Sequence, residues 1–203
     1  MTDGAPIDDV VAALEGGGVV VLPTDTVYGL AALARDRAAT ARLFALKGRS
    51  YDVPLAVLCA SVDQALSLTD ATDRPDVTAV ARGWWPGPLT LVLRRRPGVD
   101  LYLGEPSGTI GVRVPDHALV RALAKRVGPL AATSANAHGL PTPATAAEVS
   151  AQLGSGADLV VDGGRLEGRA STVIDATASP WRVLRAGPLD TAGILTTARD
   201  AAG

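Results

Sequence analysis

The sequence predicts a single α/β domain, built on a twisted sheet that mixes parallel and antiparallel strands and carries flanking helices. In the first half of the chain, short aliphatic runs alternate with stretches of helical periodicity, which is typical of parallel α/β structure. Between residues 159 and 185, three short strand patterns follow one another, which indicates antiparallel pairing. A chain of 203 residues can bury one large core, so we expect one domain over residues 1–203.

The predicted helices share apolar residues at helical spacing or a recognisable start signal. We expect helices at residues 7–14, 37–46, 61–68, 75–82, 115–127, 145–153 and 191–199. Asp116 is expected to cap the helix at 115–127, and Thr145 with Glu148 forms a capping box. The predicted strands are the aliphatic runs at residues 19–22, 54–58, 89–93, 109–114, 130–133, 159–161, 172–174 and 183–184. Residues 24–30 are predicted to form a loop rich in hydroxyl groups.

The composition is that of a globular protein, with 47% hydrophobic and 3% aromatic residues. A net charge of −2 argues against nucleic-acid binding through overall charge. The arginine run at 94–96 is nevertheless compatible with a local basic groove. The single cysteine, Cys59, excludes an intramolecular disulfide and a cysteine zinc cluster. The sequence shows no signal peptide and no membrane span, so we expect a cytoplasmic protein.

Two positive charges flank Gly48 at the predicted end of a helix. The ammonium of Lys47 and the planar fork of Arg49, joined by a flexible glycine, are suited to holding phosphate or carboxylate oxygens. The alternative is a helix end at which cations merely complement the helix dipole. The residues alone leave both interpretations open. If the pair binds an anion, Lys47→Ala should abolish turnover and leave folding intact, because a cation in a loop contributes little to stability.

Further polar side chains stand where predicted strands end, which is where open α/β sheets usually bind ligands. Arg113 is predicted to share a strand face with Thr109 and Gly111, which is unusual unless the arginine meets an anion. Thr24 and Thr26 could bind a ligand or only stabilise a turn. The polar and cationic groups at strand ends are Thr24, Lys47, Arg49, Arg113, Ser134, Asn136, Ser171 and Arg185. This set lacks a proton shuttle but suits phosphoryl or nucleotidyl transfer, in which positioning and charge neutralisation dominate.

Several common chemistries are excluded by their missing motifs. The chain has no P-loop, and the glycines at 16–18 precede a strand, so the dinucleotide-binding fingerprint is absent. Ser134 has no nucleophile elbow around it. The two histidines, His117 and His138, lack metal-ligand spacing and are expected at the surface, so we predict no protein-bound metal site.

Six short motifs together resemble the YrdC/Sua5 family of threonylcarbamoyl-AMP synthases. They occur in the family's order at residues 23–30 (PTDTVYGL), 47–49 (KGR), 85–90 (WPGPLT), 110–113 (IGVR), 134–136 (SAN) and 171–175 (STVID). The resemblance extends from about residue 18 to 187 and implies a twisted sheet around a large, positively lined cavity.

The resemblance also implies an activity, namely synthesis of L-threonylcarbamoyladenylate from L-threonine, bicarbonate and ATP, with Mg²⁺ accompanying ATP and pyrophosphate released. This is the first step in forming N6-threonylcarbamoyladenosine (t6A) in tRNA. Because the longer family form carries a C-terminal Sua5 domain that we do not expect here, the resemblance implies a short form that depends on partner proteins of the tRNA-modification machinery and has possible tRNA contact.

Roles for individual residues follow from the resemblance alone. It implies a catalytic core of Lys47, Arg49, Ser134 and Asn136. ATP would be bound by Lys47, Arg49, Thr109, Asn136, Pro143 and Arg185. Threonine would be bound by Thr24, Arg113, Ser134 and Ser171. Many relatives have proline after the K-x-R arginine and a polar residue before the next proline. Here Ser50 and Val53 occupy these places, so the conformation of this loop stays open.

Two other functions remain as alternatives. A double-stranded RNA or tRNA-binding module without turnover would use a positive lining to hold the phosphate backbone. A carbamoyl-adenylate domain of a hydrogenase-maturation carbamoyltransferase would normally lie in a much longer chain with zinc-finger motifs, which are absent here.

Overall fold

The computed structural model describes residues 7–105, 107–137 and 139–203. The helices are α1 (Ile7–Glu15), α2 (Arg37–Lys47), α3 (Val62–Ser67), α4 (Pro75–Trp84), α5 (Ala118–Val127), α6 (Ala146–Leu153) and α7 (Thr191–Ala202). The strands are β1 (Val20–Leu22), β2 (Gly29–Leu33), β3 (Ala56–Leu58), β4 (Leu89–Arg94), β5 (Thr109–Arg113), β6 (Leu130–Ser134), β7 (Leu159–Val160), β8 (Thr172–Asp175) and β9 (Arg182–Arg185).

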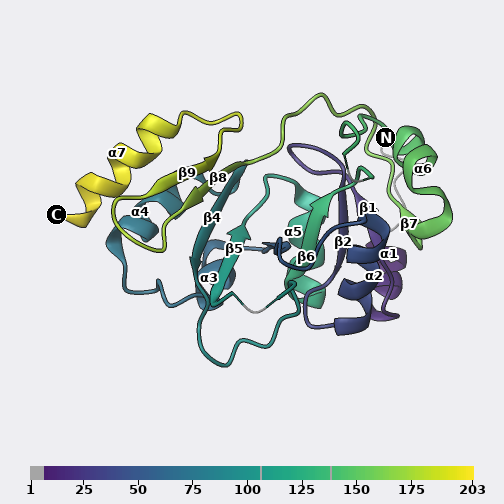
Figure 1. Cartoon of the computed structure of the whole chain (residues 1–203), viewed down its shortest axis with the longest axis horizontal. Helices are drawn as coiled ribbons and strands as arrows, with labels where there is room; N and C mark the ends of the chain where they lie inside the picture. The colour runs from purple at the N-terminus through teal and green to yellow at the C-terminus, as the bar shows by residue number, and fades with distance from the viewer. Residues whose placement is uncertain (1–6, 106, 138) are drawn as a thin grey trace.

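In the described residues, nine strands form one sheet in the order β7-β1-β2-β6-β3-β5-β4-β8-β9 (Figure 1). The pairs β1–β7, β3–β5 and β4–β8 are parallel. The other neighbours pair antiparallel. The predicted mixed sheet with flanking helices is therefore confirmed. Between β7 and β8, residues 162–171 form neither helix nor strand and cross from one side of the molecule to the other (Figure 1). We call this stretch the crossing segment.

Two local predictions are wrong. Residues 29 and 30, placed in the predicted loop, begin strand β2 (Gly29–Leu33), which was not predicted and is fully buried between β1 and β6. Its glycine and alanines have low strand propensity, so the two neighbouring strands determine its conformation. Asp116 does not cap α5, because His117 occupies the N-cap position. Asp116 instead pairs with Arg121, with 3.0 Å between Oδ1 and Nη1.

Apolar side chains form a core on each face of the sheet. Helices α2, α3, α4, α6 and α7 contribute to one core, for example through Leu43, Val80 and Ile194. The second core is smaller and contains only α1 and α5 among the helices, through residues such as Leu14 and Leu123. This second face is therefore covered mainly over β1, β2 and β6, and the described helices leave much of it open over β5, β4 and β8.

Strand register shows which side chains occupy the open part of this face. Ala56 pairs with both Gly111 and Ala132, so three small residues lie in one row across β3, β5 and β6. Alternation along β5 then puts Thr109 and Arg113 on the same face as Gly111, as predicted. Residues without bulk in this row leave room above the sheet beside polar groups.

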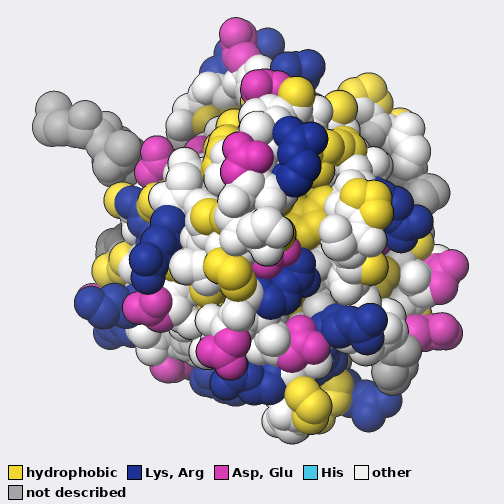
Figure 2. Space-filling model, turned by 90° about the vertical axis from the view of Figure 1, so that its left-hand side faces the viewer, with side chains coloured by type: hydrophobic (Ala, Val, Ile, Leu, Met, Phe, Trp, Pro, Cys, Tyr) yellow, Lys and Arg dark blue, Asp and Glu magenta, His cyan; other side chains and the backbone are white. Residues whose placement is uncertain are grey.

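The structure also bears on the predictions made from composition, which concern the cysteine, membrane-spanning segments and surface charge. Cys59 is fully buried, and burial raises the pKa of its thiol to about 12. No helix within residues 7–105, 107–137 and 139–203 is both long and apolar enough to cross a membrane. On the face shown in Figure 2, which is the left-hand side of Figure 1, basic and acidic side chains are interspersed.

Candidate active site

Helix α2 ends in the geometry that the sequence predicted. Asp36 caps its start by accepting a hydrogen bond from the backbone N–H of Ala39. Gly48 ends the helix in the left-handed conformation, with φ of 59°, and its N–H donates back into the last turn. Lys47 is the last helical residue, so its position follows from local capping.

Lys47 is buried, with 5% of its surface exposed. Its ammonium donates to Ser134 O (2.9 Å), Ser134 Oγ (3.2 Å) and Asn136 O (2.7 Å), and it also contacts Asn136 Oδ1. Ser134 Oγ in turn donates to Asn136 Oδ1 over 2.6 Å. The K-x-R and S-x-N motifs are thus in direct contact. The expectation that Lys47 is a loop cation of little structural weight is wrong, because its ammonium holds the end of β6 to the end of α2.

Arg49 folds back onto its own loop. Its Nε donates to Val53 O (2.8 Å) and its Nη2 donates to Pro54 O (2.9 Å). The guanidinium thereby fixes the conformation of the loop that contains Ser50 and Val53, which the sequence left open. The ring of Tyr51 in this loop stacks on Phe44, with 4.3 Å between ring centroids.

Ser171 and Arg185 form a second polar contact, between the residue before β8 and the last residue of β9. Arg185 Nε donates to Ser171 O (2.9 Å), and Arg185 Nη2 donates to Ser171 Oγ (3.0 Å). Ser171 Oγ also lies 2.9 Å from Thr90 Oγ1 on β4. Thr90 was not predicted as a site residue, although it belongs to the 85–90 motif.

Arg113 is 6% exposed and connects three parts of the chain. Its Nε donates to Gly87 O (3.1 Å), its Nη1 to Thr26 Oγ1 (3.0 Å) and its Nη2 to Asp25 Oδ1 (2.5 Å). Arg113 therefore has an anionic partner inside the protein. The sequence prediction missed Asp25, and the only available signal was its place between Thr24 and Thr26.

Thr24 stabilises the loop that follows β1. Its hydroxyl accepts from the backbone N–H groups of Thr26 and Val27, both over 3.1 Å, and donates to Val27 O over 2.6 Å. It also lies 2.9 Å from Thr26 Oγ1. The turn-forming role that the sequence allowed for Thr24 is thus present. A hydrogen-bond chain runs from Thr24 through Thr26 to Arg113.

The four site cations lie close enough to affect one another. Burial, followed by the charge of Arg49, lowers the pKa of Lys47 to about 8. Burial and then Arg185 lower the pKa of Arg49, and burial and then Arg113 lower the pKa of Arg185. Among the described residues, Lys47, Arg49 and Arg185 take part in no ion pair, whereas Arg113 pairs with Asp25. Three neighbouring cations without a carboxylate partner form a strong local attraction for a polyanion.

Two predicted ATP contacts lie farther from this cluster. Thr109 begins β5, and its hydroxyl is 3.0 Å from Ser107 Oγ. Arg113 ends the same strand, so the two residues are about 13 Å apart along it at about 3.3 Å per residue. Pro143 is buried in the loop before α6. The described contacts join neither Thr109 nor Pro143 to the other predicted site residues.

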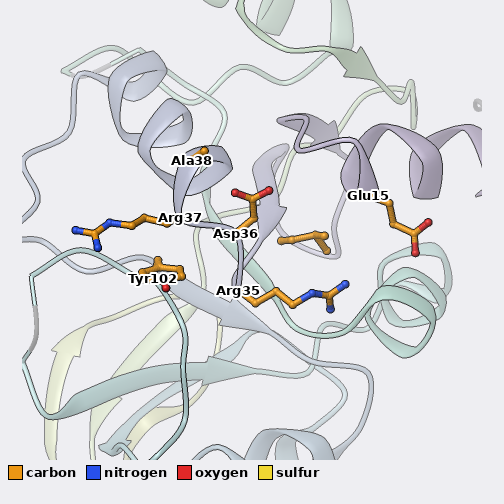
Figure 3. Close-up of a pocket in the computed structure, with 7 residues that line it drawn as sticks. Glu15, Arg35, Asp36, Arg37, Ala38 and Tyr102 are labelled. Atoms are coloured by element: carbon orange, nitrogen blue, oxygen red, sulfur yellow. The ribbon is translucent and has the colours of Figure 1, made fainter.

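A surface hollow of about 640 Å³ lies elsewhere. It lies where the end of α1 and the start of α2 face Tyr102, and Figure 3 shows Arg35 and Arg37 pointing to opposite sides of Asp36. No predicted site residue lines it, so the positively lined cavity stays a prediction. The described residues also contain no group of three or more His, Cys, Asp or Glu side chains arranged to hold a metal.

Comparison with known proteins agrees with this arrangement of motifs. A family model for Sua5, YciO and YrdC proteins, described as "telomere recombination", matches residues 12–187. The chain belongs to this family.

Relatives in the family carry a consistent name. A Mycobacterium leprae protein, provisionally named a threonylcarbamoyl-AMP synthase, is 41% identical over 93% of this chain and 86% of its own length. The threonylcarbamoyl-AMP synthase of Pyrococcus abyssi is 40% identical over 85% of this chain, but only 51% of the relative is covered. The chain therefore spans nearly all of one relative and about half of the other.

Solved structures of family members share the fold. Pyrococcus abyssi Sua5, solved in complex with L-threonine, is 36% identical with a TM-score of 0.87, and the match covers 94% of this chain and 56% of the Sua5 chain. Escherichia coli YciO is 28% identical with a TM-score of 0.82, covering 91% and 90% of the two chains. HypF matches at 24% identity and shares the fold alone.

Proposed function

We propose that this family member synthesises L-threonylcarbamoyladenylate from L-threonine, bicarbonate and ATP, with release of pyrophosphate. The observation that carries the proposal is the contact between Lys47 and the Ser134–Asn136 turn, beside two further cations that have no carboxylate partner in the described residues. ATP brings the negative charge that such a site lacks. The names of the relatives and the threonine complex of Sua5 support the choice of amino acid.

The reaction needs positioning and charge neutralisation more than proton shuttles. The neutral threonine amine attacks the carbon of bicarbonate, whose C–OH bond breaks so that water leaves with one proton of the amine, and a carbamate forms. Attack on CO₂ derived from bicarbonate gives the same carbamate with release of one proton to solvent. A carbamate oxygen then attacks the α-phosphorus of ATP, and the bond from this phosphorus to the bridging oxygen of pyrophosphate breaks. Negative charge builds up on the phosphate oxygens in this step, so fixed cations lower its barrier.

Each side chain receives a role that its position permits. Lys47, Arg49 and Arg185 neutralise the phosphates, while Ser134 and Asn136 hold Lys47 and offer their own polar atoms. Arg113 uses three of its five N–H groups on protein atoms and keeps two for the threonine carboxylate. Ser171 binds the hydroxyl or the amine of threonine, and Thr24, whose hydroxyl is fully used within its own loop, lines the threonine pocket. Thr109 and Pro143 contact the ATP nucleoside.

Mg²⁺ enters this proposal as part of the substrate Mg-ATP. The phosphates supply its oxygen ligands, which is how Mg²⁺ commonly binds beside nucleotides. We further propose that partner proteins of the t6A pathway take over the adenylate, with tRNA contacted at that stage.

Pyrophosphate release tests the proposed function. The protein is incubated with Mg-ATP, and threonine and bicarbonate are each added alone and then together. We expect release only when both are present, with serine a much poorer substrate than threonine. Release without bicarbonate would indicate a different acyl adenylation. Tight RNA binding with no release under any condition would favour the binding-module alternative.

A further inference from the structure

Among the described residues, Asp25 is the one acidic side chain that forms an ion pair with a site cation. Its Oδ1 accepts from Arg113 Nη2 over 2.5 Å, and both side chains are almost entirely buried. Its Oδ2 is buried and has no hydrogen-bond partner in the described part of the chain. A buried carboxylate with an unused oxygen costs stability, so packing alone does not account for Asp25.

Arg113 connects Asp25 to the hydroxyl of Thr26 in the same loop. Its guanidinium is planar, so fixing Nη2 on Asp25 and Nε on Gly87 O also fixes the direction of Nη1. Nη1 donates to Thr26 Oγ1 over 3.0 Å. Thr26 Oγ1 lies 2.9 Å from Thr24 Oγ1. The Thr24 hydroxyl, which its own loop also holds through Val27 O and two backbone N–H groups, is therefore linked to a carboxylate that it does not contact.

The ion pair also makes Arg113 different from the other three site cations. Arg113 is balanced by Asp25, whereas Lys47, Arg49 and Arg185 have no ion-pair partner among the described residues. A polyanion is therefore drawn toward the latter three, and Arg113 is left to a singly charged carboxylate. Without the negative charge of Asp25, the phosphates would compete with threonine for Arg113.

We propose that Asp25 is a positioning residue for threonine recognition, which orients the free N–H groups of Arg113 and, through Thr26, supports the loop that contains Thr24, without contacting the substrate. The proposal rests on the function proposed above and deepens it by naming the group that sets amino-acid selectivity. It assigns Asp25 no part in proton transfer.

Asp25→Asn tests the proposal, because the amide keeps the shape of the side chain and removes its charge. We expect the KM for threonine to rise at least tenfold and the preference for threonine over serine, measured as the ratio of kcat/KM values, to fall at least fivefold. The Kd for Mg-ATP without threonine should stay the same or fall, because the phosphates gain access to an Arg113 that Asp25 no longer balances. If Asp25 had only a structural role, the variant would bind both threonine and Mg-ATP more weakly.

Asp76→Asn provides a matched control. Asp76 is also a buried aspartate paired with an arginine, Arg74, but it lies at the start of α4 and contacts none of the predicted site residues. Its loss should lower the melting temperature while the KM for threonine and the threonine-to-serine ratio stay within twofold of the wild type.

Thr26→Val keeps the test decisive if Asp25→Asn does not fold. Valine has the shape of threonine, and the Asp25–Arg113 pair stays intact, yet the hydrogen bond to Arg113 Nη1 is lost. We expect the same rise in the KM for threonine, and the double variant should lose less than the product of the two single effects. An unchanged KM for threonine in either folded variant, or an equal loss of ATP affinity, would overturn the proposal.

Calorimetric titration of threonine separates this proposal from the proposed function. If the wild-type protein binds threonine but releases no pyrophosphate with all substrates present, the proposed reaction fails. The assignment of Asp25 would then still be decided by whether Asp25→Asn weakens threonine binding at least tenfold.

Discussion

Lys47 joins the two motifs of the candidate site, so its removal should affect both stability and catalysis. Lys47→Ala leaves buried acceptors at Ser134 and Asn136 without a donor, which costs about 1–3 kcal/mol of unfolding free energy. It also removes a phosphate-neutralising charge, and we expect pyrophosphate release to fall by at least about 100-fold. Urea unfolding and the pyrophosphate assay measure the two effects.

Arg42→Ala is the control on the same helix. Arg42 forms an exposed ion pair with Asp158, worth at most about 1 kcal/mol. We expect near-normal stability and full turnover. If both variants lost stability and turnover equally, α2 would tolerate no change of charge. This result would contradict a specific role for Lys47.

The low pKa of Lys47 predicts a pH dependence with a definite sign. Burial first and Arg49 second lower its pKa from 10.5 to about 8, so the unfolded chain binds more protons than the folded protein between these values. The unfolding free energy of the wild type, relative to Lys47→Gln, should therefore rise from about pH 8 to pH 10.5. Thermal unfolding of both proteins across this range measures the difference. A difference that falls with pH would contradict the lowered pKa.

Mg-ATP binding should respond to the same proton. The phosphates favour the charged ammonium, so binding near pH 8 should take up protons, and the Kd for Mg-ATP should increase as the pH rises above about 8. Titration calorimetry in two buffers of different ionisation enthalpy reports this uptake. Lys47→Gln should show neither the uptake nor the pH dependence of the Kd.

At the level of whole elements, the crossing segment lies directly against the loop after β1. A Cβ atom at Gly168 would lie 1.9 Å from Thr26 O, and one at Gly163 would lie 2.4 Å from Pro23 Cβ. Glycine at these positions therefore permits a backbone contact that no other residue allows. The segment supports the loop that contains Thr24 and Thr26.

Gly168→Ala should disturb the threonine site more than the ATP site. The added methyl group must push the crossing segment off Thr26, at a cost of about 1–3 kcal/mol. We expect the KM for threonine to rise about tenfold and the Kd for Mg-ATP to change little. Gly83→Ala is the control, since a Cβ there meets nothing within 4 Å. An unaltered KM in the folded Gly168 variant would show that the loop moves without consequence.

For the molecule as a whole, the charge distribution argues against RNA binding as the main function. The net charge is −2, and acidic and basic side chains are interspersed on the face in Figure 2. We expect the Kd for a 20-base-pair RNA duplex at 150 mM salt to be weaker than about 10 μM, within the range of non-specific binding. Fluorescence anisotropy would test this, and tighter binding that persists at higher salt would revive the binding-module alternative.

The sequence predicted those parts of the structure that local signals determine. Helix α2 and its end at Gly48 follow from nearby capping residues, and the contact between Lys47 and the Ser134–Asn136 turn follows from motif order. Strand β2 was missed because its alanines take their conformation from β1 and β6. Asp25 was missed because its partner, Arg113, is 88 residues away, and nothing near Asp25 indicates this pairing.

The parallel pairing of β1 with β7 also affects how the protein is made. Val19 N donates to Asp158, 139 residues later, so the pairing of β1 with β7 cannot form until Val160 has been synthesised. Ser171 and Arg185 follow later still. A growing polypeptide on the ribosome can pair β1 with β2 early, but the other edge of β1 stays exposed until β7 has been made, and the set of site cations is complete only once residue 185 has been synthesised. Ribosome-bound chains that stop before residue 185 should lack Mg-ATP affinity, however well their first strands have folded.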